Sequence, residues 1–290
     1  MSYRSAPFGG GQGIYMHEIS KALTGLGHKV DVISGPPYPD LISDVKLIKL
    51  PGLNLFRTFS FRERVNILLK KKGKSLDDWY EFFSTLLGGF PEPKTFGKRA
   101  QIFLKPNNYD VIIDNQSLSY GMLEIQALNP FIEIIHHPIS KDYYYDLKFA
   151  KGIAQRLSKM RWHSFLPMQK KVAKKIQVIV TPSLNSKVDI NCDFKVPLQN
   201  IQVIPNGIDT NIFCPLPAVK ALPYRIITTA SADVPLKGLD FTLHAMVKLK
   251  SEYLDAELIV IGSPRPDGHT ERLLQDLGLG KQVTFKTNLT

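Results

Sequence analysis

A run of glycine near the start of the chain is the first feature that could do chemistry. Gly9, Gly10 and Gly11 precede apolar residues that recur at helical spacing, so we expect a helix over about 12–26. Glycine lets a ligand approach the backbone, and the first N–H groups of such a helix would point into the loop. The pattern predicts a site for an anionic group, although a tight turn without a ligand would use the same glycines.

The glycine run does not fit a dinucleotide fingerprint. With the first glycine taken as Gly9 or Gly11, Ile14 or Met16 stands where the third glycine is required. A nicotinamide-dependent dehydrogenase is therefore disfavoured.

Two other groups stand beside expected strand ends. His136 and His137 close the apolar run 131–137, at the edge of a parallel sheet where ligands usually bind. Lys237 directly precedes Gly238, where a helix is expected to begin, so its charge would add to that helix terminus in binding a phosphate. A structural histidine and an exposed loop lysine remain the alternatives. No third ligand at a suggestive spacing supports a metal site at the histidines.

The elements that would position these groups alternate between β and α patterns. We expect strands at 28–34, 44–50, 110–114, 131–137, 177–183, 201–205, 224–231, 256–262 and 282–286. We expect helices at about 12–26, 76–88, 94–104, 117–128, 147–175, 238–251 and 269–278. Several strands are apolar without alternation, as in parallel sheets covered on both faces. The sequence predicts a doubly wound α/β architecture.

Two domains are expected from the 290 residues, at 1–205 and 206–290. A Pro- and Asn-rich passage over 193–223, in which Asn206 and Gly207 are turn residues, reads as the link between them. A glycine loop of this kind normally follows a strand. Because residues 1–7 are too short and polar for one, we expect the chain to be incomplete at its start, and its second domain to be incomplete at its end.

The charge is unevenly placed. The net charge is +11, and residues 147–188 hold ten lysines and arginines and no acid. A second basic cluster contains Phe59 and Phe61. Such stretches suit either an anionic membrane surface or a solvated helix face. Nucleic acid is disfavoured because no nucleic-acid-binding motif accompanies the charge.

Composition and targeting signals point to the cytoplasm. Two cysteines, Cys192 and Cys214, suggest neither a disulfide framework nor a metal cluster. We find no signal-peptide pattern and no apolar run long enough to span a bilayer. A cytoplasmic protein, peripheral on the inner face of a membrane if the basic stretch binds lipid, is expected.

In order along the chain, four motifs resemble the retaining GT-B glycosyltransferases of family 4. They are the glycine loop with "GHKV" closing the first helix, "HHPIS", "VIPNGID" followed by "IF", and "SADVPLKGL". The resemblance implies two Rossmann-like domains facing a cleft, a nucleotide-diphosphate sugar as donor substrate, a glycan or lipid-linked acceptor, and no cofactor or metal.

The resemblance also assigns roles to residues of this chain. His136 matches the histidine beside the transferred sugar, and Lys237 matches the lysine that neutralises the diphosphate as the glycosidic bond breaks. Nucleotide-sugar binding is expected at Gly10, Gly11, Asn206, Gly207, Ser231, Lys237 and Gly238.

The chain departs from the family pattern in two ways. Ser231 stands where the family usually has an arginine that completes a diphosphate clamp, with Arg265 as one candidate replacement. The family's paired glutamates would fall beyond Thr290. Whether residues 1–290 are active by themselves is therefore left open. Two alternatives stay open as well: another GT-B enzyme such as a sugar-nucleotide epimerase, and a non-catalytic nucleotide-binding module.

Overall fold

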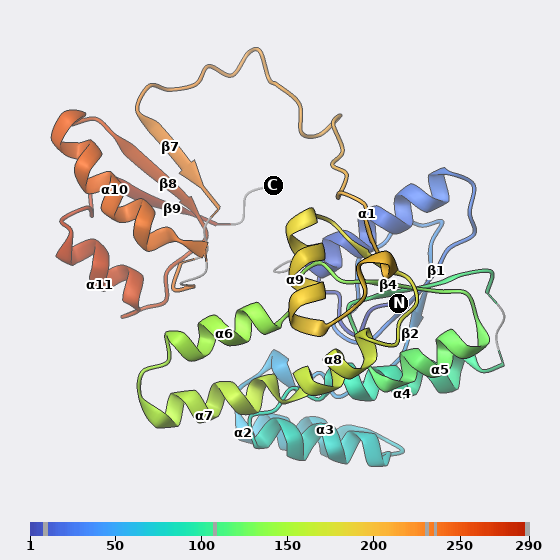
Figure 1. Cartoon of the computed structure of the whole chain (residues 1–290). Helices are drawn as coiled ribbons and strands as arrows, with labels where there is room; N and C mark the ends of the chain where they lie inside the picture. Colours follow the sequence, from blue (N-terminus) through green and yellow to red (C-terminus); the bar gives the residue numbers. More distant parts are fainter. Residues whose placement is uncertain (8–10, 107–108, 230–231, 235–236, 288–290) are drawn as a thin grey trace. The chain divides into compact units, whose positions relative to one another are not determined.

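The structure is a computed structural model that describes residues 1–7, 11–106, 109–229, 232–234 and 237–287. It divides into two compact units, Met1–Gly207 and Ile208–Thr290. Their chain paths are shown in Figure 1. The described part of the chain is α/β throughout, and its sheets are parallel.

All nine predicted strands are present, with trimmed ends. The strands of the first unit are β1 (Asp31–Ser34), β2 (Lys46–Lys49), β3 (Ile112–Asn115), β4 (Phe131–Ile134), β5 (Ile179–Thr181) and β6 (Ile201–Val203). The second unit has β7 (Arg225–Thr228), β8 (Glu257–Ile261) and β9 (Val283–Lys286). The sheets run β1–β2, β3–β4–β5–β6 and β7–β8–β9. Residues 1–7 contain only an isolated bridge, between Ser2 and Ser34 of β1.

Helices connect the strands. The first unit contains α1 (Gly11–Gly25), α2 (Phe61–Lys70), α3 (Leu76–Leu86), α4 (Glu92–Leu104), α5 (Tyr120–Leu128), α6 (Ser140–Lys148), α7 (Gly152–Trp162), α8 (Leu166–Ala173) and α9 (Leu184–Phe194), with short 3-10 turns at Leu55–Arg57, His163–Phe165 and Leu198–Asn200. The second unit contains α10 (Leu239–Glu252) and α11 (His269–Asp276).

Three helices, α2, α6 and α9, were not predicted. Two of them carry a local signal, because Ser60 and Ser183 cap the first turns of α2 and α9 by accepting hydrogen bonds from Glu63 N and Ser186 N. The single helix expected over 147–175 is wrong. Gly152, with φ +80°, starts α7 anew, and a 3-10 turn precedes α8.

Pro167 lies in the first turn of α8, where no helical hydrogen bond needs its missing N–H, and so it separates α8 from α7 within the basic stretch. The link is shorter than predicted. Residues 193–200 belong to the first unit, because Phe194 and Val196 are fully buried in its core. Residues 204–224 are almost all exposed and form no helix or strand.

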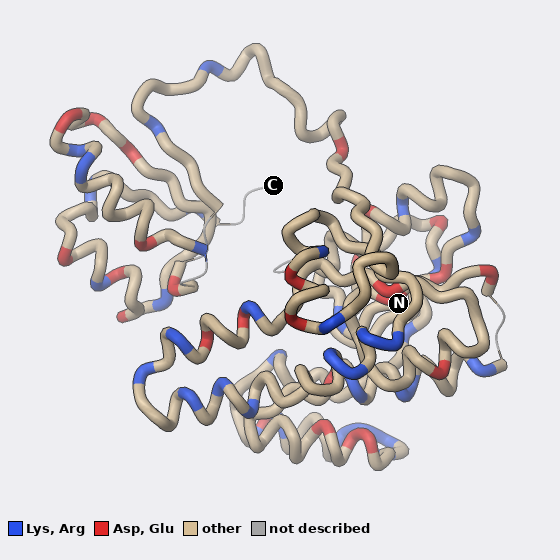
Figure 2. Tube along the Cα trace, viewed as in Figure 1, with Lys and Arg blue, Asp and Glu red and all other residues tan. Residues whose placement is uncertain are grey.

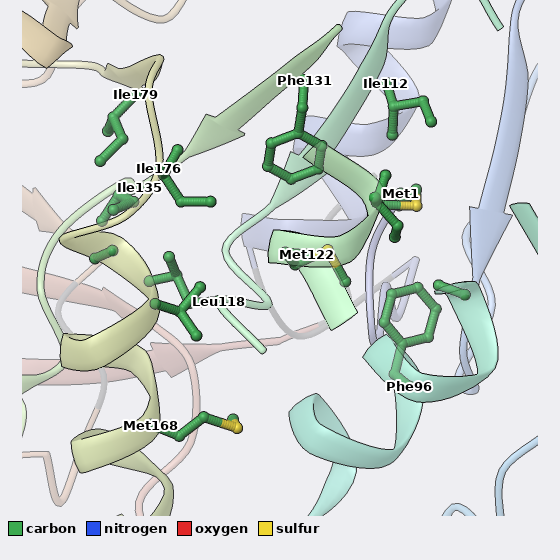
Figure 3. Packing of buried hydrophobic residues seen from close by; sticks show 14 of the residues in the cluster. Met1, Phe96, Ile112, Leu118, Met122, Phe131, Ile135, Met168, Ile176 and Ile179 are labelled. Carbon is green, nitrogen blue, oxygen red and sulfur yellow. The ribbon is translucent and has the colours of Figure 1, made fainter. Parts of the chain in front are cut away.

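The core of the first unit joins strands of both of its sheets to helices α4, α5, α8 and α9. Met122, Phe96 and Leu118 pack with strand residues such as Ile112 and Phe131 (Figure 3).

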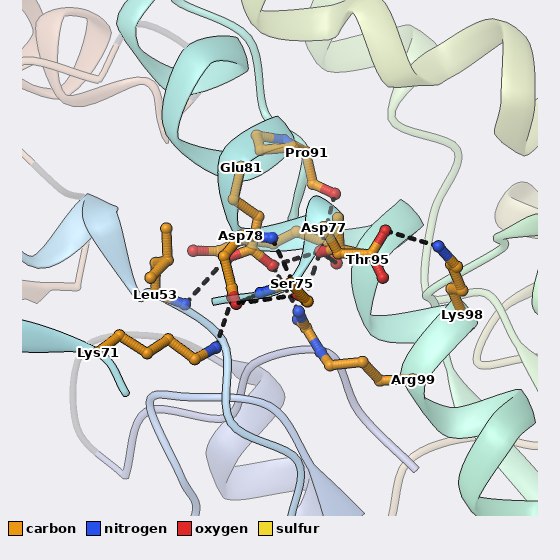
Figure 4. A network of polar contacts seen from close by, with 11 residues as sticks. Leu53, Lys71, Ser75, Asp77, Asp78, Glu81, Pro91, Thr95, Lys98 and Arg99 are labelled. Carbon is orange, nitrogen blue, oxygen red and sulfur yellow. Dashed lines mark hydrogen bonds and ion pairs between the residues drawn. The ribbon is translucent and has the colours of Figure 1, made fainter. Parts of the chain in front are cut away.

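A polar network fastens α3 to α4 (Figure 4): Glu81 accepts hydrogen bonds from Leu53 N (2.9 Å), Thr95 Oγ1 and Arg99 Nη1 (2.8 Å). A smaller core, centred on Leu243, Met246 and Leu258, holds the second unit together.

Two acidic residues are buried side by side in the four-stranded sheet of the first unit. Asp114 of β3 pairs in register with Glu133 of β4, and both are fully buried. Burial raises the pKa of both carboxyl groups, and for Glu133 the neighbouring Asp114 raises it further. Asp114 also accepts hydrogen bonds from Ser117 N (2.8 Å) and Oγ (2.9 Å). The pair therefore favours a neutral carboxyl group and fixes the turn that follows β3.

Candidate functional site

The carboxyl end of β3 forms a strained turn that carries three polar side chains. Gln116 and Leu118 have φ values of +60° and +47°, in the left-handed region that non-glycine residues rarely occupy. The bonds from Asp114 to Ser117 hold this conformation. Strain of this kind is typical of functional sites, where surrounding contacts must maintain it.

His136 lies against this turn, one strand away. Its Nε2 donates to Asn115 Oδ1 (2.8 Å), and its backbone N–H donates to Gln116 Oε1 (3.0 Å). The ring of Tyr15, from α1, stands edge-on to the imidazole at 4.6 Å between centroids. Ser186 Oγ donates to the His136 carbonyl (2.9 Å). Three elements, β3 with its turn, α1 and α9, thus fix the position of this histidine, and the contact with Asn115 Oδ1 selects the tautomer protonated at Nε2.

Burial lowers the pKa of His136, and the neighbouring His137 adds to the effect. At neutral pH the imidazole is therefore uncharged, and it offers a hydrogen-bonding nitrogen rather than a positive charge. His137 turns away: it is exposed and its Nε2 lies 2.9 Å from Asp142 Oδ2. The two histidines of "HHPIS" consequently have different surroundings.

The described part of the glycine loop places the start of α1 close to this edge. Gly11 opens the helix, and a Cβ built on it would meet nothing within 4 Å. Gly10 lies outside the described residues. A Cβ on Gly13 would come within 1.9 Å of the Ala6 carbonyl oxygen. The sequence analysis did not single out Gly13, since its contact is with residues seven positions away.

Arg4 and Glu92 add a charged pair beside Tyr3. Arg4 Nη1 lies 3.2 Å from Glu92 Oε2, and the arginine also faces the ring of Phe90. Glu92 opens α4, a helix that returns toward β3, so its first turn lies at the carboxyl edge of the sheet. Burial raises the pKa of Glu92 to about 7, partly offset by Arg4. This carboxyl group would change its charge near neutral pH.

Several buried polar atoms around this edge have no hydrogen-bond partner within the described part of the chain. They are Ser5 Oγ, Glu92 Oε1, Asn115 Nδ2, Ser119 Oγ and Thr181 Oγ1. Buried polar groups are normally hydrogen-bonded to protein or water. Asn115 Nδ2, at the end of β3, and Thr181 Oγ1, at the end of β5, are the two of these atoms that lie at strand ends, where they are able to hydrogen-bond to a ligand or to water.

In the second unit, two cations stand on neighbouring loops. Lys237 is exposed and precedes Gly238, which caps α10 in the left-handed conformation at φ +71°. Arg265 is exposed on the loop after β8. Because β7 and β8 are adjacent parallel strands, both loops leave the same edge of the sheet.

Asp233 ties these two loops together. Its carboxylate accepts hydrogen bonds from Arg265 N (2.8 Å) and Thr270 N (2.9 Å), and its own N–H donates to Thr270 Oγ1 (2.9 Å). Those backbone hydrogen bonds, together with the charge of Arg265, lower the pKa of Asp233 despite partial burial. Asp233 is a positioning residue that sequence reasoning missed.

The remaining predicted site residues carry less structural information. Asn206 and Gly207 are exposed in the segment that follows β6. Ser231 lies outside the described residues. The assigned roles of all the predicted site residues stay predictions.

A model of Glycosyltransferase Family 4 matches residues 9–212. The chain belongs to this family. It is 39% identical over 294 residues to an MMP alpha-(1->4)-mannosyltransferase of Mycolicibacterium hassiacum, an alignment that covers 100% of the chain and 70% of the relative. A probable sucrose-phosphate synthase of Thermosipho melanesiensis is 26% identical over 90% of the chain and 60% of that protein.

Solved structures show the same fold as this family 4 glycosyltransferase. A glycosyltransferase from Rickettsia africae matches 99% of the chain and 68% of its own length, with a TM-score of 0.57 and 17% identity. An alpha,alpha-trehalose 6-phosphate synthase from Burkholderia multivorans matches 100% of the chain and 72% of its own length, with a TM-score of 0.51 and 12% identity. The predicted GT-B fold and the predicted family are confirmed.

We predict that Gly13→Ala destabilises the first unit, because its Cβ would overlap the Ala6 carbonyl oxygen. Overpacking of this kind costs roughly 1–3 kcal/mol of unfolding free energy. Gly11→Ala is the matched control, since it lies in the same helix turn with open space around it. Urea denaturation of both variants checks the difference. Equal stabilities would show that α1 can shift away from residues 5–6 without loss.

Proposed function

We propose that this glycosyltransferase moves a hexose from a nucleotide-diphosphate donor to a glycan or lipid-linked acceptor, with retention of anomeric configuration. The identity of 39% with a mannosyltransferase, over the whole chain, carries the proposal. That relative's name describes an alpha-linked product. Transfer from an alpha-linked nucleotide sugar to an alpha-linked product retains the anomeric configuration. Because the relative is named a mannosyltransferase, mannose is the first sugar to test.

The two units would contribute different chemistry. In the second unit, Lys237, Arg265 and the N-terminus of α10 supply positive charge that would bind and neutralise a diphosphate. In the first unit, the neutral imidazole of His136 would hydrogen-bond to the transferred sugar. No metal or cofactor enters this scheme, because the cations serve the leaving diphosphate.

The function is tested by incubating the enzyme with nucleotide-diphosphate hexoses, with and without candidate glycan acceptors. Acceptor-dependent formation of an alpha-glycosidic bond, read by NMR, supports the proposal. Conversion of donor to a new sugar without acceptor would identify an epimerase instead. Binding of nucleotide with no turnover of any donor would identify a binding module.

We predict that His136→Ala lowers kcat by about 10²-fold while KM for the donor changes little. Removal of a group that acts chiefly in the transition state has this kinetic effect. Removal of one hydrogen-bonding group that stabilises the transition state typically lowers kcat by about 10²–10³-fold. His137→Ala is the matched control, because that side chain is exposed and bonds only Asp142 among the described residues. Loss of thermal stability in His136→Ala with unchanged kcat would assign it a structural role.

We predict that Lys237→Ala weakens the binding of nucleoside diphosphates about 10- to 100-fold. A lost charge-assisted hydrogen bond costs roughly 1.5–3 kcal/mol, and each 1.4 kcal/mol is a factor of ten. Lys248→Ala is the control, because this exposed lysine lies within α10, away from the N-terminus that Lys237 precedes. Calorimetric titration measures both affinities. Identical affinities for the two variants would remove the phosphate role from Lys237.

We also propose a cytoplasmic enzyme that contacts anionic membrane through its basic stretch. Of the helices in the described part of the chain, none combines the length and apolarity needed to cross a bilayer. Helix α7 contributes no buried residue. It exposes Ile153 (78%), Leu157 and Met160 at helical spacing. Figure 2 shows basic residues along α7 and α8. This combination favours an interfacial helix.

We predict that the protein sediments with vesicles of 30% phosphatidylserine at low salt and is released as salt rises. Each exposed basic residue near such a surface contributes about 1 kcal/mol, screened over roughly 8 Å at physiological salt. The triple charge reversal Lys151→Glu, Arg156→Glu and Arg161→Glu should abolish binding. Reversal of Lys220, Lys248 and Lys281, also exposed, is the charge-matched control. Equal binding by both variants would show that α7 is not the contact.

A further inference from the structure

Helix α3 turns a largely polar side toward the interior of the first unit. Asp78, Glu81 and Thr85 are between 1% and 4% exposed, and with Phe82 they form the buried face of the helix. Acidic residues are rarely buried unless they are paired. A helix that covers a core normally directs its apolar residues inward and its polar residues to solvent. In α3 the two acidic residues point inward instead.

The buried carboxyl groups of α3 have partners in the body of the unit. Asp78 accepts hydrogen bonds from Ser75 N and Ser75 Oγ, both at 2.9 Å, and from Lys71 Nζ. Glu81 accepts from Arg99 in the network of Figure 4. Because both carboxyl groups must face these partners, the contacts set the rotation of the helix about its axis.

The opposite face of α3 carries large apolar side chains that are exposed to solvent. They recur at helical spacing, and their exposed fractions run from 37% for Leu86 to 84% for Leu76. The α3 stripe, as we call this set, consists of Leu76, Trp79, Tyr80, Phe83, Leu86 and Leu87. Trp79 and Phe83 stack at 6.0 Å between ring centroids. One exposed apolar residue needs no explanation, but a contiguous set is typical of a surface that contacts a membrane or another protein.

Basic side chains border the α3 stripe. Figure 2 shows them at the end of α2, in the turn that follows, and on α4. The exposed lysines of these elements are Lys70, Lys72, Lys74, Lys94 and Lys98. Lys94 Nζ lies 4.4 Å from the ring centroid of Tyr80, and Lys98 Nζ lies 3.0 Å from Asp77 Oδ1. The apolar stripe therefore has a positively charged rim.

The positive rim decides between the partners that such a stripe could bind. A second copy of the chain in a two-fold dimer would bring the same lysines together, and like charges across an interface oppose association. An anionic bilayer offers a negative surface to the lysines and an apolar interior to the stripe. Tryptophan and tyrosine are enriched at that interface, and lysine side chains extend along apolar surface to keep their charge in water.

We propose that α3 lies in the plane of an anionic membrane surface and inserts the α3 stripe below the lipid headgroups. This inference rests on the proposed membrane contact of α7, to which it adds an inserted apolar helix. The ends of the two helices adjoin. A Cβ built on Gly88, just after α3, would lie 3.7 Å from Arg161 Nε, and Trp162 stacks on Phe90 at 5.0 Å between ring centroids. Figure 1 shows α3 and α7 on the same side of the first unit.

Fluorescence of Trp79 tests the insertion. The chain has two tryptophans, Trp79 and Trp162, so Trp162→Phe leaves the stripe residue as the only indole. Vesicles of phosphatidylcholine and phosphatidylserine with brominated acyl chains quench an indole that reaches the acyl region. At low salt they should lower the emission at least about twofold relative to unbrominated vesicles, because an interfacial helix buries its apolar face to the acyl boundary. The Tm of the variant in solution checks that the fold is kept.

Serine substitution of the α3 stripe is the second test, in the chain with both tryptophans. The triple variant Leu76→Ser, Phe83→Ser and Leu87→Ser should lower the vesicle partition coefficient at least about tenfold, since full burial of even one such side chain is worth a factor of ten or more. The control replaces two leucines and one phenylalanine that are exposed elsewhere, and it should bind as the wild type does: Leu128→Ser, Phe241→Ser and Leu254→Ser.

Trp79 emission that brominated lipid leaves unchanged, or equal partition of the two triple variants, would overturn the insertion of α3. If the wild type still sediments with the vesicles, the α7 contact survives that result. A wild type that stays in the supernatant at low salt would remove both. Light scattering that gives a dimer for the wild type and a monomer for the stripe variant would also overturn the proposal, because a second copy would then cover the stripe. Quenching of Trp79 and weaker partition of the stripe variant, in a monomer, support it.

Discussion

Parallel strand pairing is the constraint on which the rest of the first unit depends. Because β3 and β4 pair in register from Ile112 with Phe131 to Asn115 with Ile134, both strands end at the same level. The residues that follow, Asn115 and Gln116 on one side and His136 on the other, are then within hydrogen-bonding distance. The same pairing also forces Asp114 and Glu133 together in the interior. The site geometry and the buried carboxyl pair have one origin.

The second unit reaches a similar result by other means. Its sheet again brings two loops to one edge, but a single carboxylate, that of Asp233, fixes their relative position by accepting backbone hydrogen bonds from the second loop. Because Asp233 bonds to backbone N–H groups of the second loop, its hydrogen bonds do not involve the side chains of Lys237 and Arg265. The loop backbone is held, while exposed cations remain able to meet an anionic ligand.

The sequence analysis located every strand because buried parallel strands are short apolar runs, a pattern that needs no tertiary information. It missed α6 because none of that helix's residues is buried, which leaves little hydrophobic periodicity to detect. Gly13 escaped notice because its requirement arises from residues 5–6 folding back on α1, a contact that no local pattern records. Asn115 and Gln116 were missed for the same reason: their partner His136 is twenty residues away along the chain.

The placement of the cysteines gives the molecule built-in labelling sites. The chain has two, Cys192 on α9 and Cys214 in the exposed segment that follows Gly207, and both are free and exposed. Thiols of this kind react with maleimide or methanethiosulfonate probes without any mutation. A spin label on Cys192 would be carried by a packed helix, whereas one on Cys214 would sit on the connecting segment itself. Their two spectral components would therefore report, in one native chain, how freely that segment moves when a nucleotide is added.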